Sequence, residues 1–169
     1  MSNLVRARQI FWDYACNHFH LDRDGQLAEY VEAGGCKEHE AEWRHEYILN
    51  KVAEAQAHDK NALFGLQVAE AVEAIPSLLL MEDFGDDYFR FWHAFTLNHL
   101  AKFASNSATG KQAKNAAIET WRELLSRPIL IAQRNRHRVS AEVLEMWKAQ
   151  SVEEYLRNYC LRLLEENSV

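Results

Sequence analysis

Apolar side chains recur every three or four residues along most of the chain, and this spacing constrains the fold more than any other feature. A period near 3.6 residues places such side chains on one face of an α-helix. The clearest example is the segment 37–57, whose stripe consists of Trp43, Tyr47, Ile48, Val52 and Ala55. Interruptions are scarce, since the 169 residues include six glycines and two prolines. The sequence therefore predicts long helices and contains no convincing strand.

The same spacing, read with helix-start and helix-stop residues, predicts the other helices. They cover residues 3–20, 26–33, 62–75, about 86–104, 111–126, 140–149 and 151 to near the C-terminus. Pro76 is expected to end one of them, and Asp86 or Asp87, Ser140 and Ser151 are expected to cap others. The helix around 88–103 carries aromatic residues on every face, which is typical of a central helix. We expect one all-α domain over 1–169, a bundle of about six to eight helices around this aromatic-rich helix.

Charge is distributed unevenly along the chain. The formal net charge is −6, but residues 1–100 carry −9 and residues 101–169 carry +3. A general nucleic-acid binder needs a basic surface, so direct nucleic-acid binding is not expected. An acidic region instead favours a basic protein partner, because complementary fields steer association.

One segment concentrates this negative charge. Glu38, Glu42 and Glu46 stand four residues apart, a ladder of like charges that costs a few tenths of a kcal/mol per neighbouring pair. Glu40 and Arg44 form the one obvious offsetting pair on the same predicted helix, and the preceding helix adds Glu29 and Glu32. Trp12 lies off the apolar stripe of its own helix and is a candidate exposed anchor. The predicted partner-binding residues are Glu29, Glu32, Glu38, Glu42, Glu46 and Trp12.

These observations favour a non-enzymatic, acidic protein-binding module. An inhibitor or immunity protein that neutralises a basic toxin or nuclease fits the charge and size, and a homodimer is also compatible with them. Motifs for nucleophilic catalysis, phosphate binding and dinucleotide binding are absent, so neither an enzyme of a familiar cofactor class nor a cofactor is expected. The three cysteines are widely spaced, and no apolar run approaches membrane-spanning length, so a cytoplasmic protein is expected.

The alternative function is that of a metal-dependent all-α hydrolase or a metal-binding helical bundle. Imidazole and carboxylate groups on one helix face can bind zinc or iron. The candidate ligands are His39, Glu42, His45, Glu46, His58 and Asp59. The pair His58-Asp59, taken with His93 and His99, resembles the ligands of HD-type phosphohydrolases, but no Asp after Asp87 completes that set.

A single basic cluster, Arg134–Arg138, follows Arg127 in the second half of the chain. Arginine side chains of this kind bind phosphate or carboxylate groups. The cluster therefore fits a phosphate, an acidic protein patch or the acidic half of the chain itself. We favour the last of these, within one molecule or across a homodimer.

Overall fold

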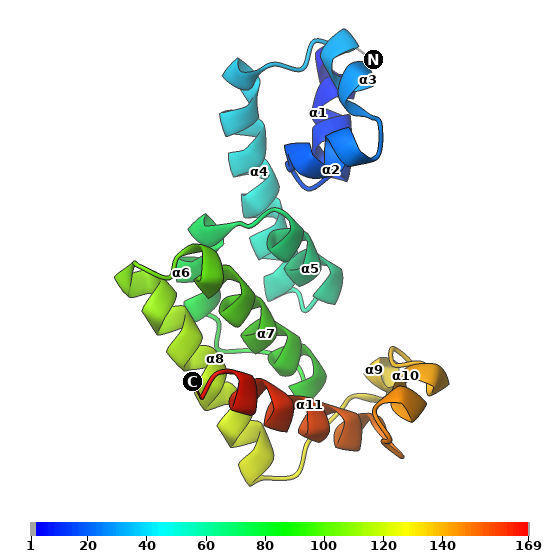
Figure 1. Ribbon diagram of the computed structural model, residues 1–169, viewed down its shortest axis with the longest axis vertical. Helices are drawn as coiled ribbons and strands as arrows, with labels where there is room; N and C mark the ends of the chain where they lie inside the picture. Colours follow the sequence, from blue (N-terminus) through cyan, green and yellow to red (C-terminus); the bar gives the residue numbers. More distant parts are fainter. Residues whose placement is uncertain (1–2, 169) are drawn as a thin grey trace. The chain divides into compact units, whose positions relative to one another are not determined.

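The computed structural model describes residues 3–168 and confirms the all-α class (Figure 1). These residues form eleven α-helices and one 3-10 helix, and none of them lies in a strand. The number exceeds the expected six to eight because several helices are only four to six residues long. The chain divides into two compact units: unit 1 ends at Ala74 and unit 2 begins at Ile75. A single domain over 1–169 stays a prediction.

Unit 1 is built around the long helix α4. Its elements are α1 (Asn3–Asp13), α2 (His18–Arg23), α3 (Leu27–Glu32), α4 (Lys37–Gln56), α5 (Lys60–Val68) and the 3-10 helix η1 (Val72–Ala74). The expected continuous helix over residues 3–20 is wrong, because α1 ends at Asp13 and α2 begins at His18. Ala15 and Cys16 adopt φ angles of +52° and +56°, which end the first helix, and the side chain of Asn17 caps α2. A single apolar stripe does not reveal such a break, because both pieces use it.

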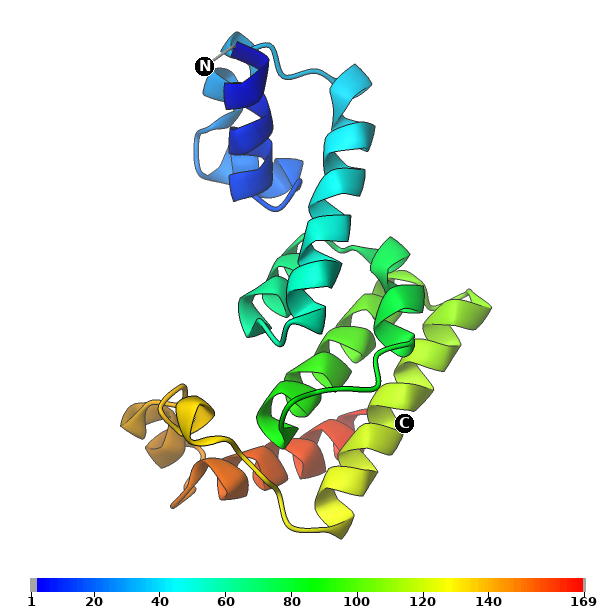
Figure 2. The same ribbon diagram turned by 180° about the vertical axis from the view of Figure 1, so that it is seen from behind.

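Unit 2 is centred on the helices α7 and α8, which run side by side in opposite directions (Figures 1 and 2). Its elements are α6 (Ile75–Leu79), α7 (Asp87–Phe103), α8 (Ala108–Ser126), α9 (Gln133–Arg136), α10 (Ala141–Met146) and α11 (Val152–Glu166). Both α6 and α11 pack against α8. Pro76 lies in the first turn of α6 and does not end a helix there, since a first-turn residue needs no N–H partner.

The aromatic-rich helix predicted from the sequence is α7, and most of its residues are buried. On one side its rings meet α11, where Phe91 and Phe95 lie 5.3 and 5.9 Å from the ring centre of Tyr159. The expected caps at Asp86 and Ser151 are also present. Asp86 accepts from the N–H of Phe89 at 2.9 Å, and Ser151 accepts from that of Glu154 at 3.2 Å. Local sequence therefore fixes where these two helices begin.

His93, buried in α7, gives the fold a pH dependence that can be measured. Its Nε2 lies 2.9 Å from the Leu78 carbonyl oxygen, and burial lowers its pKa to about 4. Because the unfolded chain takes up this proton near pH 6.5 and the folded chain does not, stability falls as the pH drops from about 6.5 towards 4. We expect a slope of up to about 1.4 kcal/mol per pH unit. Urea unfolding across this range, repeated with His93→Gln, measures it, and an unchanged slope in the variant would contradict the assignment.

Candidate functional site

The glutamate ladder lies on α4 as the sequence predicts. Glu38, Glu42 and Glu46 all fall within this helix, and Asn50 and Glu54 continue the same four-residue spacing. Residues four apart on a helix are neighbours, with Cβ atoms about 6 Å apart. These five residues therefore form one ridge along α4, which we call the acidic ridge.

Arginines of α1 neutralise two of the predicted partner-binding glutamates. Arg6 forms an ion pair with Glu29, and Arg8 forms one with Glu46 at 2.5 Å. Arg6 and Arg8 are two residues apart on a helix and so project towards opposite sides of α1. Glu29 and Glu46 thus lie on different sides of this helix, and the six predicted residues do not form one continuous face.

The expected offsetting pair between Glu40 and Arg44 is wrong. Arg44 donates to the carboxylate of Glu73 at 2.8 Å and to the carbonyl of Ala69 at 2.9 Å. Glu40 instead accepts a hydrogen bond from the hydroxyl of Tyr30 at 2.8 Å and lies 2.9 Å from Nε2 of His18. Both side chains are engaged within unit 1, so Arg44 does not compensate the negative charge of the acidic ridge.

Three of the predicted glutamates remain exposed. Within residues 3–168, none of Glu32, Glu38 and Glu42 has a basic partner. A hydrogen bond from the thiol of Cys36 lowers the pKa of Glu38, which keeps this carboxylate ionised. The amino-terminal half of the acidic ridge therefore carries negative charge that the described part of unit 1 leaves uncompensated.

The carboxyl-terminal half of the acidic ridge borders a groove of about 690 Å³ between α1, α4 and α5. This volume lies in the usual range of about 300–1,000 Å³ for ligand sites. The walls combine aromatic rings with amide and carboxylate groups. They include Trp12, Tyr14, Tyr47, Phe64, Asn50 and Glu54. Lys51, which also lines the groove, forms an ion pair with Glu54 at 2.7 Å. Such a lining suits a long side chain that has an apolar stem and a polar end.

The close approach of Tyr47 to Gly65 sets the shape of this groove. Tyr47 is buried and burial raises its pKa to about 12, so its hydroxyl stays protonated. Gly65 makes room for that hydroxyl, because a Cβ there would lie 2.7 Å from it. Phe64, beside Gly65, is 64% exposed. Besides Trp12, the isolated glycine inside a helical pattern is a sequence signal for this site.

Trp12 belongs to the groove and is half-buried, in contrast to the expected exposed anchor. Its Nε1–H donates to the carbonyl of Trp43 at 2.9 Å, and the guanidinium of Arg8 lies 4.3 Å from its ring centre. These contacts hold the indole in place. Trp12 is therefore a fixed wall of the groove.

Among residues 3–168, no group of three or more His, Cys, Asp or Glu side chains is arranged to hold a metal ion. His39 stacks on the Trp43 ring at 5.3 Å, whereas His45, six residues later and about 120° around the helix, is exposed. His58 and Asp59 follow the far end of α4, a helix about 30 Å long. Asp59 caps α5 by accepting from the N–H of Asn61 at 2.9 Å. The three histidines among the alternative ligands therefore do not converge on one site.

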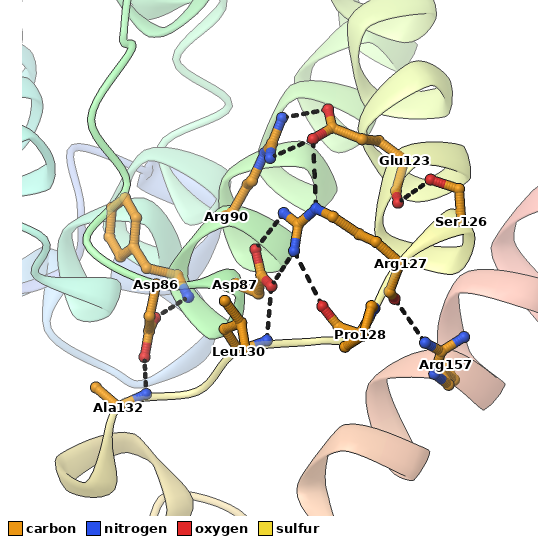
Figure 3. Close-up of polar contacts among 11 residues, drawn as sticks. Asp86, Asp87, Arg90, Glu123, Ser126, Arg127, Pro128, Leu130, Ala132 and Arg157 are labelled. Atoms are coloured by element: carbon orange, nitrogen blue, oxygen red, sulfur yellow. Dashed lines mark hydrogen bonds and ion pairs between the residues drawn. The ribbon is translucent and has the colours of Figure 1, made fainter.

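In unit 2, Asp87 and Arg127 join the start of α7 to the segment that follows α8 (Figure 3). Arg127 donates to both carboxylate oxygens of Asp87, at 2.7 and 2.8 Å, and the N–H of Leu130 donates to Asp87 at 2.7 Å. Arg90 makes a two-point contact with Glu123 beside them. The carboxylates of this clamp are all engaged by its own arginines and backbone, so it serves structure.

The basic cluster Arg134–Arg138 also lies in unit 2. Arg136 forms an ion pair with Glu153 of α11, while Arg134 and Arg138 are exposed and have no acidic partner within residues 3–168. Within residues 3–168, no arginine of the cluster pairs with a carboxylate of residues 1–100, whereas Arg127, which precedes the cluster, pairs with Asp87. A homodimer contact through the cluster stays a prediction.

Comparisons with known protein families, with curated proteins and with solved structures find no match to this chain. Within residues 3–168, no helix has both the length and the apolar character needed to cross a membrane.

Proposed function

We propose that the chain is a non-enzymatic protein-binding module that docks a basic partner on unit 1, and that it acts as an inhibitor or immunity protein against a basic toxin or nuclease. The observation that carries this proposal is where the charge lies. Unit 1 has seven Lys and Arg against thirteen Asp and Glu, a net −6, whereas unit 2 has twelve of each. The entire negative excess of the chain therefore belongs to the unit that carries the acidic ridge and the groove.

The acidic ridge and the groove supply the two parts that a tight interface needs. Exposed carboxylates at Glu38 and Glu42 speed the encounter with a basic surface. The groove, with Trp12 and Tyr47 already fixed, offers a site for an anchoring side chain of the partner at little cost in ordering. Exposed carboxylates of this kind fit an inhibitor of a nuclease, because they complement its basic surface.

Reversing the charge of the acidic ridge tests the proposal. We expect Glu38→Lys with Glu42→Lys to leave the fold intact and to weaken partner binding at least about tenfold. Wild type and variant are used as bait in lysate of the source organism at low and high salt. The captured protein is then identified by mass spectrometry, purified and titrated against both. One basic protein, held at low salt and released at high salt, is the expected result.

A matched control separates a local effect from one of net charge. Glu119→Lys with Glu145→Lys changes the charge equally at two exposed positions of unit 2 that have no basic partner within residues 3–168. This control should bind as wild type does. If the control loses the partner equally, or if the ridge variant keeps it at low salt, docking through the acidic ridge is refuted.

A further inference from the structure

Two adjoining cavities lie in unit 2 where α7 ends, α8 begins and α11 ends. Their volumes are about 380 and 350 Å³, and they share Asn98, Lys102 and Asn167 in their walls. We call them together the lysine recess. It involves none of the residues of unit 1, so a ligand site there is independent of the function proposed for unit 1.

The first cavity carries positive charge that nothing nearby compensates. Lys102, Lys111 and Lys114 line it, and none of them has an ion pair within residues 3–168. The one carboxylate in the recess, Glu166, is held by Arg162 at 2.8 Å. Lys111 stands in the first turn of α8, where the helix dipole disfavours cations. A bound anion would offset both the repulsion among the three lysines and the unfavourable interaction of a cation with the start of α8.

Asn98 gives a second and independent indication of a ligand. The residue is only 6% exposed, and its amide makes no hydrogen bond within residues 3–168. The other buried asparagine, Asn135, donates to the carboxylate of Asp86 at 2.8 Å. Asn98 lines both cavities and so presents its amide to whatever occupies them.

The second cavity differs in character from the first. Phe95 and Tyr159 line it as half-buried rings with centres 5.9 Å apart. Aromatic walls of this kind take planar rings by stacking. The recess thus offers ammonium groups at one end, the rings of Phe95 and Tyr159 beside the Arg162–Glu166 pair at the other, and the amide of Asn98 between them.

We propose that the lysine recess binds a small phosphorylated ligand that contains a planar ring, a chemistry represented by a nucleoside diphosphate. The phosphates contact Lys102, Lys111 and Lys114, and the ring lies against Phe95 and Tyr159. The amide of Asn98 hydrogen-bonds the ligand between these ends. Binding of this kind gives unit 2 a role separate from partner docking.

Calorimetric titration of the full chain with ADP tests this assignment. Wild type should bind one ADP, inorganic phosphate should compete with it, and adenosine should bind at least about tenfold more weakly because it lacks the charges that the lysines contact. Lys111→Gln with Lys114→Gln should weaken ADP binding about tenfold. Arg122→Gln with Arg138→Gln removes the same charge at exposed positions of unit 2 outside the recess and should leave it unchanged.

Asn98→Leu distinguishes a ligand contact from a structural role. Because the amide makes no hydrogen bond within residues 3–168, its replacement should leave the melting temperature about unchanged, while ADP binding weakens about tenfold. The proposal is overturned if folded wild type binds no ADP, if adenosine binds as tightly as ADP, or if the arginine control loses as much affinity as the lysine variant. Loss of stability together with unchanged ADP binding in Asn98→Leu would assign this residue to packing.

Discussion

Replacing Asp87 by alanine is expected to lower the free energy of unfolding by about 3 kcal/mol. The Asp87 side chain is 7% exposed, and its carboxylate accepts three hydrogen bonds, two from Arg127 and one from the N–H of Leu130. Its removal leaves a guanidinium and a backbone donor without their acceptor. The expected loss stands at the lower end of the range for buried ion pairs because the Arg127 side chain is 33% exposed.

Thermal and urea unfolding measure this effect, with a fall in melting temperature of about 6–12 °C expected for a chain of this size. Glu82→Ala, an exposed neighbour with no basic partner within residues 3–168, should change stability by less than about 0.5 kcal/mol. The double variant Asp87→Ala with Arg127→Met should lose less than the sum of the single changes. Strict additivity would mean that the two side chains do not act together.

The same clamp predicts a second pH dependence, below that of His93. Burial alone would raise the pKa of Asp87, but the hydrogen bonds from Arg127 and Leu130 and the nearby positive charges lower it more, to a value below the ordinary one. A depressed carboxyl pKa stabilises the fold above about pH 4, and this contribution is lost as the pH falls further. Below pH 4, stability should therefore fall less steeply in Asp87→Ala than in wild type.

The sequence predicts the parts of this structure that local rules control. The 3.6-residue spacing is enough for α4, α7 and α11, and the caps at Asp86 and Ser151 follow from side chains that bond within three residues. A helix break that preserves the apolar spacing, as at Ala15 and Cys16, cannot be recognised from that spacing. Helix class therefore follows from local sequence, whereas continuity depends on backbone angles that the spacing does not encode.

Long-range pairs cannot be predicted in the same way. The sequence makes Asp87 a candidate cap, yet it pairs with Arg127, forty residues away. Any of nineteen Lys and Arg residues is an equal choice from the sequence alone. The lysine recess cannot be predicted from the sequence for the same reason. Lys102 comes close to Lys111 and Lys114 only when α7 and α8 fold back on each other. A run of neighbouring arginines such as Arg134–Arg138 is conspicuous in a sequence, whereas a cluster assembled by a helical hairpin is not.

Gly110, near the start of α8, is a position where the close turn between α7 and α8 outweighs helix propensity. Alanine is favoured over glycine inside a helix by about 1 kcal/mol, so Gly110→Ala should stabilise α8 if propensity decided the outcome. In the structure, a Cβ at Gly110 would lie 2.1 Å from the carbonyl oxygen and 2.6 Å from the carbonyl carbon of Ala104. These are backbone atoms of the turn that joins the two helices, and they cannot swing aside as a side chain can.

We therefore expect Gly110→Ala to destabilise the protein by about 3 kcal/mol, the upper end of the usual cost of overpacking. Urea unfolding followed by circular dichroism measures it. Gly25→Ala is the matched control, because Gly25 has a φ of +71° but no atom lies within 4 Å of the position that its Cβ would take, so it should lose only about 1 kcal/mol through backbone strain. A stabilised Gly110→Ala variant would mean that α8 does not approach Ala104 this closely. Since Gly110 also lines the lysine recess, the close hairpin turn and the proposed ligand site would then both need revision.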